Sequence, residues 1–98
     1  MLRVQFQGNG NLMRIEGRLV GSFAEDTRSL ITAKNIPAGL VVDLSELNYC
    51  DALGDEVLSW LGRLGCRFIA GNTYSSFICM TLSLPMAHSG ARDTLASD

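Results

Sequence analysis

The chain has 98 residues, of which 47% are hydrophobic and 18% charged, and its formal net charge is −2. This composition is typical of one folded domain and excludes a disordered chain. The single lysine, Lys34, and the even spread of charge argue against a nucleic-acid-binding surface. The longest mostly apolar stretch, residues 77–87, is far shorter than the roughly 20 residues that cross a bilayer. Polar residues at positions 3, 5 and 7 interrupt any signal-peptide pattern, so we expect a cytoplasmic protein without direct membrane insertion.

Three cysteines, Cys50, Cys66 and Cys79, stand among apolar neighbours without CxxC spacing. An odd number of cysteines in this arrangement predicts neither a disulfide framework nor a zinc site. We expect free, buried thiols that pack as small hydrophobic side chains, with a redox role as the alternative. No metal and no cofactor is expected.

The first third of the chain predicts a hairpin followed by a helix. Apolar and polar residues alternate over 2–7 and again over 12–16, and the turn-forming residues 8–11 separate them, which predicts two antiparallel strands. Ser22, with Glu25 three residues later, has the pattern of a capping box. The helix that it opens should end near Asn35. Its expected apolar face consists of Phe23, Thr27, Leu30 and Ile31.

The middle of the chain predicts a buried strand and a second helix. Residues 39–44 form a compact apolar run, which is typical of a central parallel strand, and 45–50 are expected to form a loop. Asp51 is a good N-cap for the following helix, and Gly65 fits its C-terminal end. The predicted core-facing stripe of this helix is Leu53, Val57, Leu61 and Leu64.

The last third predicts a strand over 66–70, a turn at Gly71-Asn72 and a third helix over 75–84, closed by Pro85. The element order is therefore β-β-α-β-α-β-α, which indicates an α/β domain with a mixed sheet of about four strands and helices packed on it. We expect this domain to occupy residues 1–86 and the small, polar residues 87–98 to form a disordered tail.

This order of elements, together with the amino-acid sequence in the middle of the chain, resembles the STAS domain family. The most specific part is residues 41–54, VVDLSELNYCDALG, in which an apolar strand ends in Asp-Leu-Ser and Asp51-Ala52-Leu53-Gly54 opens a helix. In the family, the motif that opens this helix is Asp-Ser-Ser-Gly or Asp-Ser-Ala-Gly. Residues 16–19, EGRL, are similar to the Gly-x-Leu that ends the family's second strand. The resemblance covers residues 2–84.

The resemblance implies a bacterial anti-sigma-factor antagonist, which is a non-catalytic protein-binding module in signal transduction and transcription regulation. Such modules dock on a kinase-type anti-sigma factor, which switches them off by phosphorylating the serine after the aspartate. The docking surface implied for this chain consists of Asn48, Tyr49, Asp51, Ala52, Leu53, Gly54 and Asp55. The chain departs from the family at Ala52, which has no hydroxyl, so no phosphorylation is expected there and the protein is expected to be a non-phosphorylatable regulator or scaffold.

Other interpretations stay open. A stand-alone STAS protein can be an accessory subunit of a membrane lipid ABC transporter, or a module that senses a small ligand. Asp51, Asp55 and Glu56 could bind a cation or carry acid–base chemistry, but they also fit a capped, dipole-matched helix start, and we expect no catalytic residue. His88, the only histidine, has no expected partner.

Two further features point to protein contacts. Trp60 lies beside the predicted stripe of the second helix, either at the edge of the core or as an exposed anchor. The third helix is apolar on more than one face, which predicts a protein partner or a homodimer contact. The residues concerned are Phe77, Ile78, Met80 and Leu82.

Overall fold

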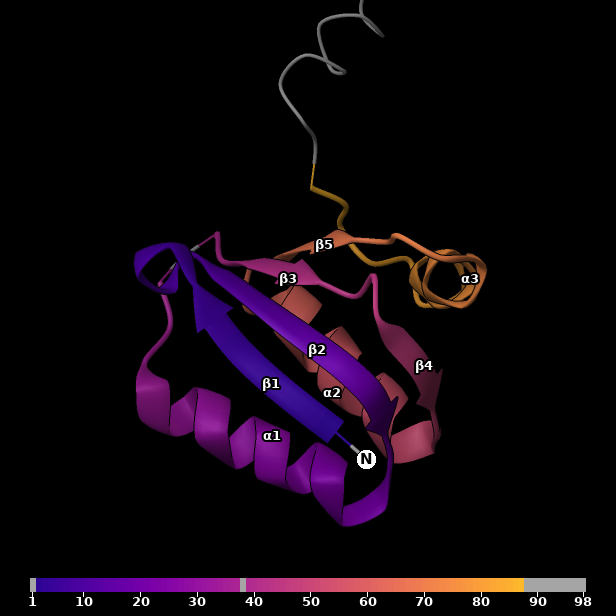
Figure 1. Ribbon diagram of the computed structural model, residues 1–98, viewed down its shortest axis with the longest axis horizontal. Coiled ribbons are helices and arrows are strands. Elements are labelled where there is room, and N and C mark those ends of the chain that lie inside the picture. Colours follow the sequence, from indigo (N-terminus) through magenta and orange to yellow (C-terminus); the bar gives the residue numbers. More distant parts are fainter. Residues whose placement is uncertain (1, 38, 88–98) are drawn as a thin grey trace, which may run out of the picture.

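The computed structural model describes residues 2–37 and 39–87. In this part of the chain, five strands and three α-helices follow one another (Figure 1). They are β1 (Leu2–Gln7), β2 (Leu12–Leu19), α1 (Gly21–Lys34), β3 (Val41–Asp43), β4 (Leu47–Cys50), α2 (Ala52–Arg63), β5 (Arg67–Ile69) and α3 (Thr73–Thr81), with a short 3-10 turn, η1 (Gly8–Gly10), between β1 and β2. The expected α/β class with a mixed sheet is confirmed.

Strand β2 is the centre of the sheet. Its residues 12–17 pair antiparallel with the whole of β1, which confirms the predicted hairpin. On its other side the first half of β2 pairs parallel with β3, and β3 pairs parallel with β5. The second half of β2 pairs parallel with β4. One long strand therefore holds three others.

The strand β4 was not predicted, because a loop was expected over 45–50. In β4 the two end residues Leu47 and Cys50 are buried, whereas Asn48 and Tyr49 are both exposed. The register with β2 shifts between Gly17 and Arg18, so that the extra residue Asn48 breaks the alternation of inward and outward side chains. A period of two is the signal by which a half-buried strand is recognised, and this strand lacks it.

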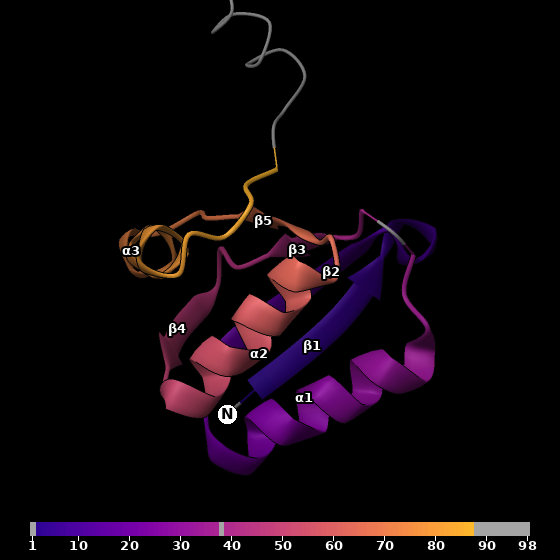
Figure 2. The same ribbon diagram turned by 180° about the vertical axis from the view of Figure 1, so that it is seen from behind.

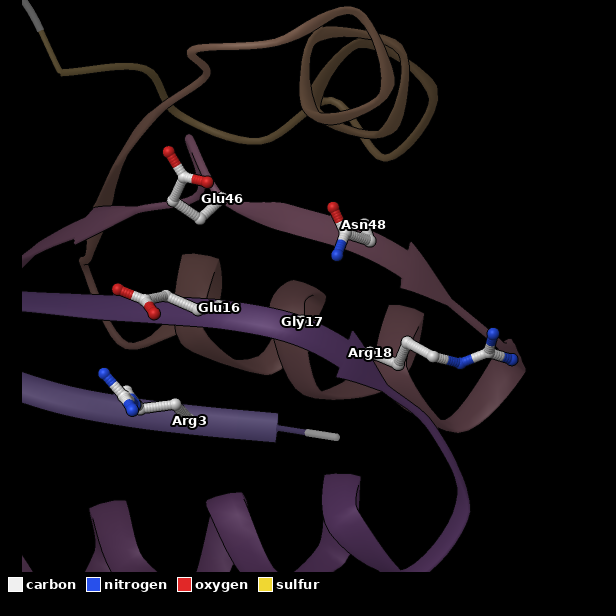
Figure 3. A pocket seen from close by; sticks show the side chains of 6 residues that line it. All are labelled: Arg3, Glu16, Gly17, Arg18, Glu46 and Asn48. Atoms are coloured by element: carbon white, nitrogen blue, oxygen red, sulfur yellow. The ribbon is translucent and has the colours of Figure 1, made fainter.

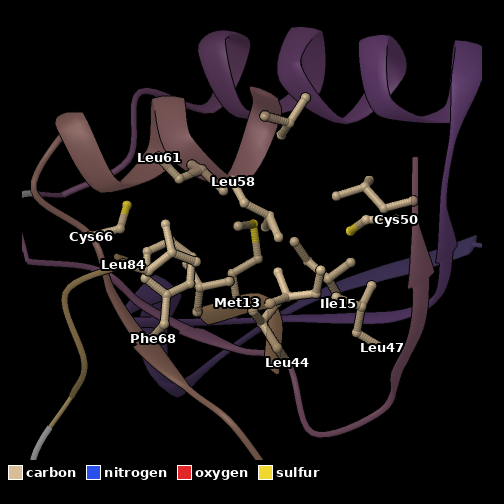
Figure 4. Close-up of a cluster of buried hydrophobic side chains, with 14 of the residues drawn as sticks. Met13, Ile15, Leu44, Leu47, Cys50, Leu58, Leu61, Cys66, Phe68 and Leu84 are labelled. Carbon is tan, nitrogen blue, oxygen red and sulfur yellow. The ribbon is translucent and has the colours of Figure 1, made fainter. Parts of the chain in front are cut away.

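Helices α1 and α2 lie together on one face of the sheet (Figures 1 and 2). Figure 4 shows Leu58 and Leu61 of α2 pointing toward the side chains of the strands. Met13 and Ile15 of β2 and Phe68 of β5 are fully buried beneath them. The three cysteines are free and buried within or beside this core, as expected.

Helix α1 begins two residues earlier than predicted, and its cap differs. Val20 is the N-cap residue and makes no side-chain cap bond, so the predicted capping box of Ser22 with Glu25 is wrong. The residues of α1 that are buried are Ala24, Thr27 and Ile31, whereas Phe23 and Leu30 are exposed. The small Ala24 allows α1 to pack closely on its neighbours, which turns the larger side chains outward. The helix ends at Lys34 with Asn35 as the C-cap, as expected.

Helix α2 has the predicted N-cap, Asp51, and its buried face matches the predicted stripe at two of four residues, Val57 and Leu61. Val57, Leu58 and Leu61 are buried, whereas the expected stripe members Leu53 and Leu64 are 40% and 48% exposed. The observed buried face differs from the predicted stripe because Leu58 lies centrally above the sheet, whereas Leu53 and Leu64 lie near the two ends of the helix and are exposed. Trp60 is half-buried at the edge of the core, and Arg28 of α1 lies over its ring at 4.9 Å.

Helix α3 lies beside β4 at the edge of the sheet (Figure 1). It starts at Thr73 and ends at Thr81, earlier at both ends than the predicted 75–84, because Asn72 caps it and Ser83 adopts a left-handed conformation. Beyond it, Pro85 O and Ala87 N–H bond to Phe68 of β5. Of the predicted tail, residues 87–98, all but Ala87 lie outside the described residues, His88 included. None of the helices in the described part is long and apolar enough to cross a membrane.

The observed face of α2 gives a direct test. We predict that Leu58→Ala lowers the free energy of unfolding by about 2–5 kcal/mol, because a fully buried side chain leaves a cavity. Leu64→Ala, which the sequence placed in the same stripe, should cost about 0.5 kcal/mol or less because this side chain is half exposed. Urea denaturation of the two variants measures the difference, and equal losses would contradict the observed orientation.

Candidate functional site

The junction between β4 and α2 is organised by the Asp51 carboxylate. Its Oδ1 accepts a hydrogen bond of 2.9 Å from the Gly54 N–H, which caps α2. Its Oδ2 accepts a second bond of 2.9 Å from the Gly21 N–H, the first residue of α1. The hydrogen bond from the Gly54 N–H, together with that from the Gly21 N–H, holds the pKa of Asp51 below its ordinary value of 3.8. One side chain therefore fixes the starts of both helices, which explains why α1 needs no cap of its own.

Gly54 lets α2 approach the end of β2. A Cβ atom at this position would overlap the carbonyl oxygen of Leu19, and this oxygen belongs to the backbone and has no freedom to move away. Any side chain would push the start of α2 away from the sheet. The glycine that the resemblance matches is thus required here for packing.

The side chains around this junction form a surface that we call the β4–α2 surface: Asn48, Tyr49, Asp51, Ala52, Leu53, Gly54 and Asp55. Asn48, Tyr49, Ala52 and Leu53 are exposed, whereas Gly54 is buried beneath them. The structure therefore brings the predicted residues together, but they have two different roles. Asp51 and Gly54 build the frame, and the four exposed residues are free to contact another molecule.

Two residues that the sequence analysis did not single out, Arg18 and Tyr74, support this surface. Arg18, at the end of β2, lies over the Tyr49 ring with its Cζ atom 5.2 Å from the ring centroid. Tyr74 of α3 stacks against Tyr49, with 6.2 Å between ring centroids. The Cys50 N–H donates a 2.8 Å hydrogen bond to the Tyr74 hydroxyl. These contacts join residues far apart in the sequence.

Asn72 fastens the start of α3 to the same region. Its Nδ2 donates hydrogen bonds to the carbonyl oxygens of Ser45, at 2.7 Å, and Leu47, at 3.2 Å. Its Oδ1 accepts the Ser75 N–H in a reciprocal capping box. An Asn followed three residues later by a hydroxyl side chain is a cap pattern, so this signal was present in the sequence.

Asp55 lies inside the edge of the β4–α2 surface. Burial raises the pKa of this carboxyl, and the nearby Asp51 carboxylate raises it further. Its Oδ1 atom is buried and makes no hydrogen bond within the described part of the chain. No group of three His, Cys, Asp or Glu side chains that could hold a metal ion occurs among the described residues. The acidic helix start is therefore a capped end at which one buried carboxyl oxygen, Asp55 Oδ1, has no hydrogen-bond partner in the described part of the chain.

Asp43 has the bonding of a strand-end residue. Burial by itself would raise the pKa of Asp43, but the Ser45 N–H bond at 2.9 Å and the Arg14 guanidinium at 3.4 Å lower it below its ordinary value. Burial raises the pKa of the Cys50 thiol to about 12, with the carboxylates of Asp55 and Asp51 adding to the effect. A thiol in this state does not serve as a nucleophile near neutral pH.

An open groove lies on the sheet face opposite α1 and α2 (Figure 3). Its lining residues are Arg3, Glu16, Gly17, Arg18, Glu46 and Asn48. In Figure 3 the Arg3 and Glu16 side chains point toward one end of the strands and Arg18 toward the other, so the charged groups do not converge. Small-ligand sites need a concave pocket with converging polar groups, which this groove lacks.

Comparisons with known proteins inform on the fold. No family model and no curated protein matches the sequence. Among solved structures, "Structure of the Anti-Sigma Factor Antagonist SpoIIAA in its Unphosphorylated Form" matches with a TM-score of 0.61 and 12% sequence identity, over 99% of this chain and 96% of that chain. The fold is similar to that of SpoIIAA. The expected STAS-like architecture is therefore confirmed as a fold, with one more strand than was predicted.

The close approach at Gly54 predicts a specific cost. Gly54→Ala should lower the free energy of unfolding by about 1–3 kcal/mol, because the new methyl group overlaps a backbone oxygen. The matched control is Gly62→Ala in the same helix, where the new Cβ would lie 3.3 Å from a Pro85 side-chain atom. Both changes gain the same helix propensity, so chemical denaturation should show a clearly larger loss for Gly54→Ala, and equal losses would contradict the packing argument.

The Asp51 carboxylate predicts a pH dependence. Because its pKa is lowered in the folded state, its stabilisation is present above the ordinary value of 3.8 and is lost as the pH falls through the folded-state pKa. Asp51→Asn retains one acceptor oxygen for two amide donors, so we expect the Tm at neutral pH to fall by roughly 5 °C. The decline of Tm from neutral pH to about pH 3 should be smaller in the variant than in the wild type, with Asp43 supplying the rest. Parallel declines would show that Asp51 is not the titrating group.

Proposed function

We propose that this protein is a non-catalytic protein-binding module of the STAS type, which acts like an anti-sigma-factor antagonist through the β4–α2 surface. The observation that carries the proposal is the exposure of Tyr49 and Leu53, 44% and 40%, on a junction that Asp51 and Gly54 hold rigid. Aromatic and aliphatic side chains on a rigid frame lose little conformational freedom when they bind. Such side chains are typical of the anchors of a protein interface.

The charges around this surface indicate the kind of partner. Asp51, Asp55 and Glu56 lie in the cap and first turn of α2 or just beyond, and Glu46 precedes β4. Arg18 is the nearby cation, and it is held over the Tyr49 ring. We therefore infer a partner whose docking face is basic around an apolar centre. SpoIIAA is named an anti-sigma factor antagonist, so a kinase-type anti-sigma factor is the partner that we propose.

Ala52 decides how such binding would be regulated. It is the first residue of α2 and is exposed, at the position that the family resemblance matches with the phosphorylated serine. Without a hydroxyl this position cannot accept a phosphoryl group. The carboxylates of Asp51, Asp55 and Glu56 would also repel a phosphate at this helix end. We propose a constitutive binder whose activity follows the concentration of its partner.

The other interpretations stay predictions. A role as accessory subunit of a lipid ABC transporter would use the same surface with another partner. A small-ligand sensor would need an enclosed site, and the groove of Figure 3 is open. The homodimer contact expected through α3 now rests on Phe77 and Met80, which are 58% and 78% exposed, because Ile78 is buried.

A pair of matched variants tests the proposed surface. Leu53→Arg places a cation at the centre of the β4–α2 surface, whereas Leu30→Arg makes the same change on α1 at a side chain with nearly the same exposure, 41% against 40%. We expect Leu53→Arg to weaken binding to the purified kinase-type anti-sigma factor of the native host by at least roughly tenfold, because it breaks an apolar contact at the interface centre. Leu30→Arg should leave the affinity unchanged.

Affinity purification from the native host with both variants and the wild type comes first, because it identifies the proteins for titration. Recovery of an anti-sigma factor with wild type and Leu30→Arg, but not with Leu53→Arg, supports the proposal. Recovery of a membrane-associated ATPase in the same pattern would favour the transporter interpretation instead. Equal recovery by all three baits would show that docking takes place elsewhere.

A further inference from the structure

We infer that the docking surface extends from β4 onto α3, so that one partner protein covers Tyr49, Phe77 and Met80 together. In this arrangement α3 lies at the apolar centre of the interface, and the acidic start of α2 forms part of its rim. The inference rests on the function proposed above, because it concerns the same partner. It follows from the size of the β4–α2 surface, from the contacts that join this surface to α3 and from the distribution of charge.

The β4–α2 surface is too small to form a whole interface. Four of its seven residues are exposed. A specific protein–protein interface covers roughly 800 Å² and about 20–30 residues on each partner. A partner that binds this surface must therefore cover neighbouring parts of the chain as well.

Strand β4 lies between the start of α2 and helix α3 (Figures 1 and 2). Tyr49 of β4 therefore stands between Leu53 of α2 and Tyr74 of α3. The two tyrosine rings are stacked with 6.2 Å between their centroids, and the Tyr74 hydroxyl accepts a hydrogen bond from the Cys50 N–H. The apolar part of the β4–α2 surface continues onto α3 through this stacked pair.

The outer side of α3 carries Phe77 and Met80, which have the two largest exposed fractions among the large hydrophobic side chains of the described residues. Phe77 follows Tyr74 by three positions and Met80 follows Phe77 by three, so these side chains are neighbours on successive turns. Ile78 and Cys79 are buried and fix the other side of the helix to the core. A contiguous group of exposed apolar side chains is typical of a site of protein contact.

The distribution of charge separates a centre from a rim. Residues 68–91, which include the whole of α3, contain no Asp, Glu, Lys or Arg. The acidic residues Asp51, Asp55 and Glu56 stand in the cap and first turns of α2. The centre of a protein interface is apolar and depleted of charge, whereas its rim is polar. This division fits a partner whose docking face is basic around an apolar centre, and it assigns that centre to α3 and Tyr49.

A second copy of the chain is the competing occupant of α3. In a two-fold symmetric contact the same surface meets itself, so each acidic rim would need basic groups on an identical surface. Arg18 is the cation close to this surface in the described part of the chain, and it is held over the Tyr49 ring. A second copy therefore offers little complementary charge, which favours a different protein as the partner.

Two double variants that leave the net charge unchanged test the inference. Phe77→Ser with Met80→Ser removes the exposed apolar side chains of α3. Leu30→Ser with Leu64→Ser removes two exposed leucines from α1 and from the end of α2, away from β4. We expect the α3 pair to weaken binding to the purified kinase-type anti-sigma factor of the native host by at least roughly tenfold, because it removes apolar contacts at the centre of the interface. The leucine pair should leave the affinity within about twofold.

Amide hydrogen exchange gives a second, local readout on the wild-type protein. On binding of the anti-sigma factor, exchange in residues 73–81 should slow by a larger factor than exchange in residues 27–34 of α1. A helix that the partner covers opens less often, whereas general stabilisation by binding slows exchange in both helices. Equal slowing in the two segments would contradict the inference.

Leu53→Arg separates this inference from the proposed function. If Leu53→Arg weakens binding and the α3 pair does not, the proposed function stands and the extension onto α3 is overturned. Weakening by the α3 pair alone, or equally by both double variants, would also overturn the extension. If neither change weakens binding, or if no anti-sigma factor binds the wild type, both proposals are overturned.

Sedimentation of the protein alone tests the competing occupant. We expect a monomer across the concentrations used for the titration. Self-association that the α3 pair abolishes would assign α3 to a second copy and overturn the inference. Circular dichroism and thermal melting of each variant confirm that it is folded before binding is measured.

Discussion

A single carboxylate joins the parts of this domain on which the rest is built. Asp51 bonds the first turn of α2 through Gly54 and the first residue of α1 through Gly21. The two helices cover the same face of the sheet, so their starts must be fixed relative to each other for the core side chains to meet. The absence of a side chain at Gly54 lets α2 descend onto the carbonyl of Leu19. Position, capping and close packing thus depend on four residues at one corner of the fold.

The features that could be predicted from the sequence are those set by residues close to one another along the chain. The hairpin, the Asp51 cap and the end of α1 at Asn35 depend on neighbouring residues, and the structure confirms them. The cap of α1 could not be inferred, because its acceptor comes from a residue 30 positions away. The strand β4 was not predicted because a register shift against β2 turns two consecutive side chains, Asn48 and Tyr49, outward. In each case the missing information lay in a tertiary contact.

The candidate site shows the same division. Asp51 and Gly54 were found from their motif, and the structure gives the physical reason for both. Arg18 and Tyr74, which hold Tyr49 in place, come from β2 and α3 and have no pattern that links them in the sequence. The lack of a hydroxyl at Ala52 could be read directly. Its position at the exposed first turn of α2 required the structure.

The short segment after α3 has a consequence for the outer edge of the sheet. Phe68 donates its N–H to the Pro85 oxygen and accepts a bond from the Ala87 N–H, and Met86 bridges to it in parallel. A bare strand edge offers unpaired amides to other chains, and pairing between such edges leads to aggregation. Residues 85–87 therefore cover the outer edge of β5 and prevent it from pairing with other chains. A chain ending with α3 would lose it, and its solubility would come to depend on an edge that the intact protein keeps covered.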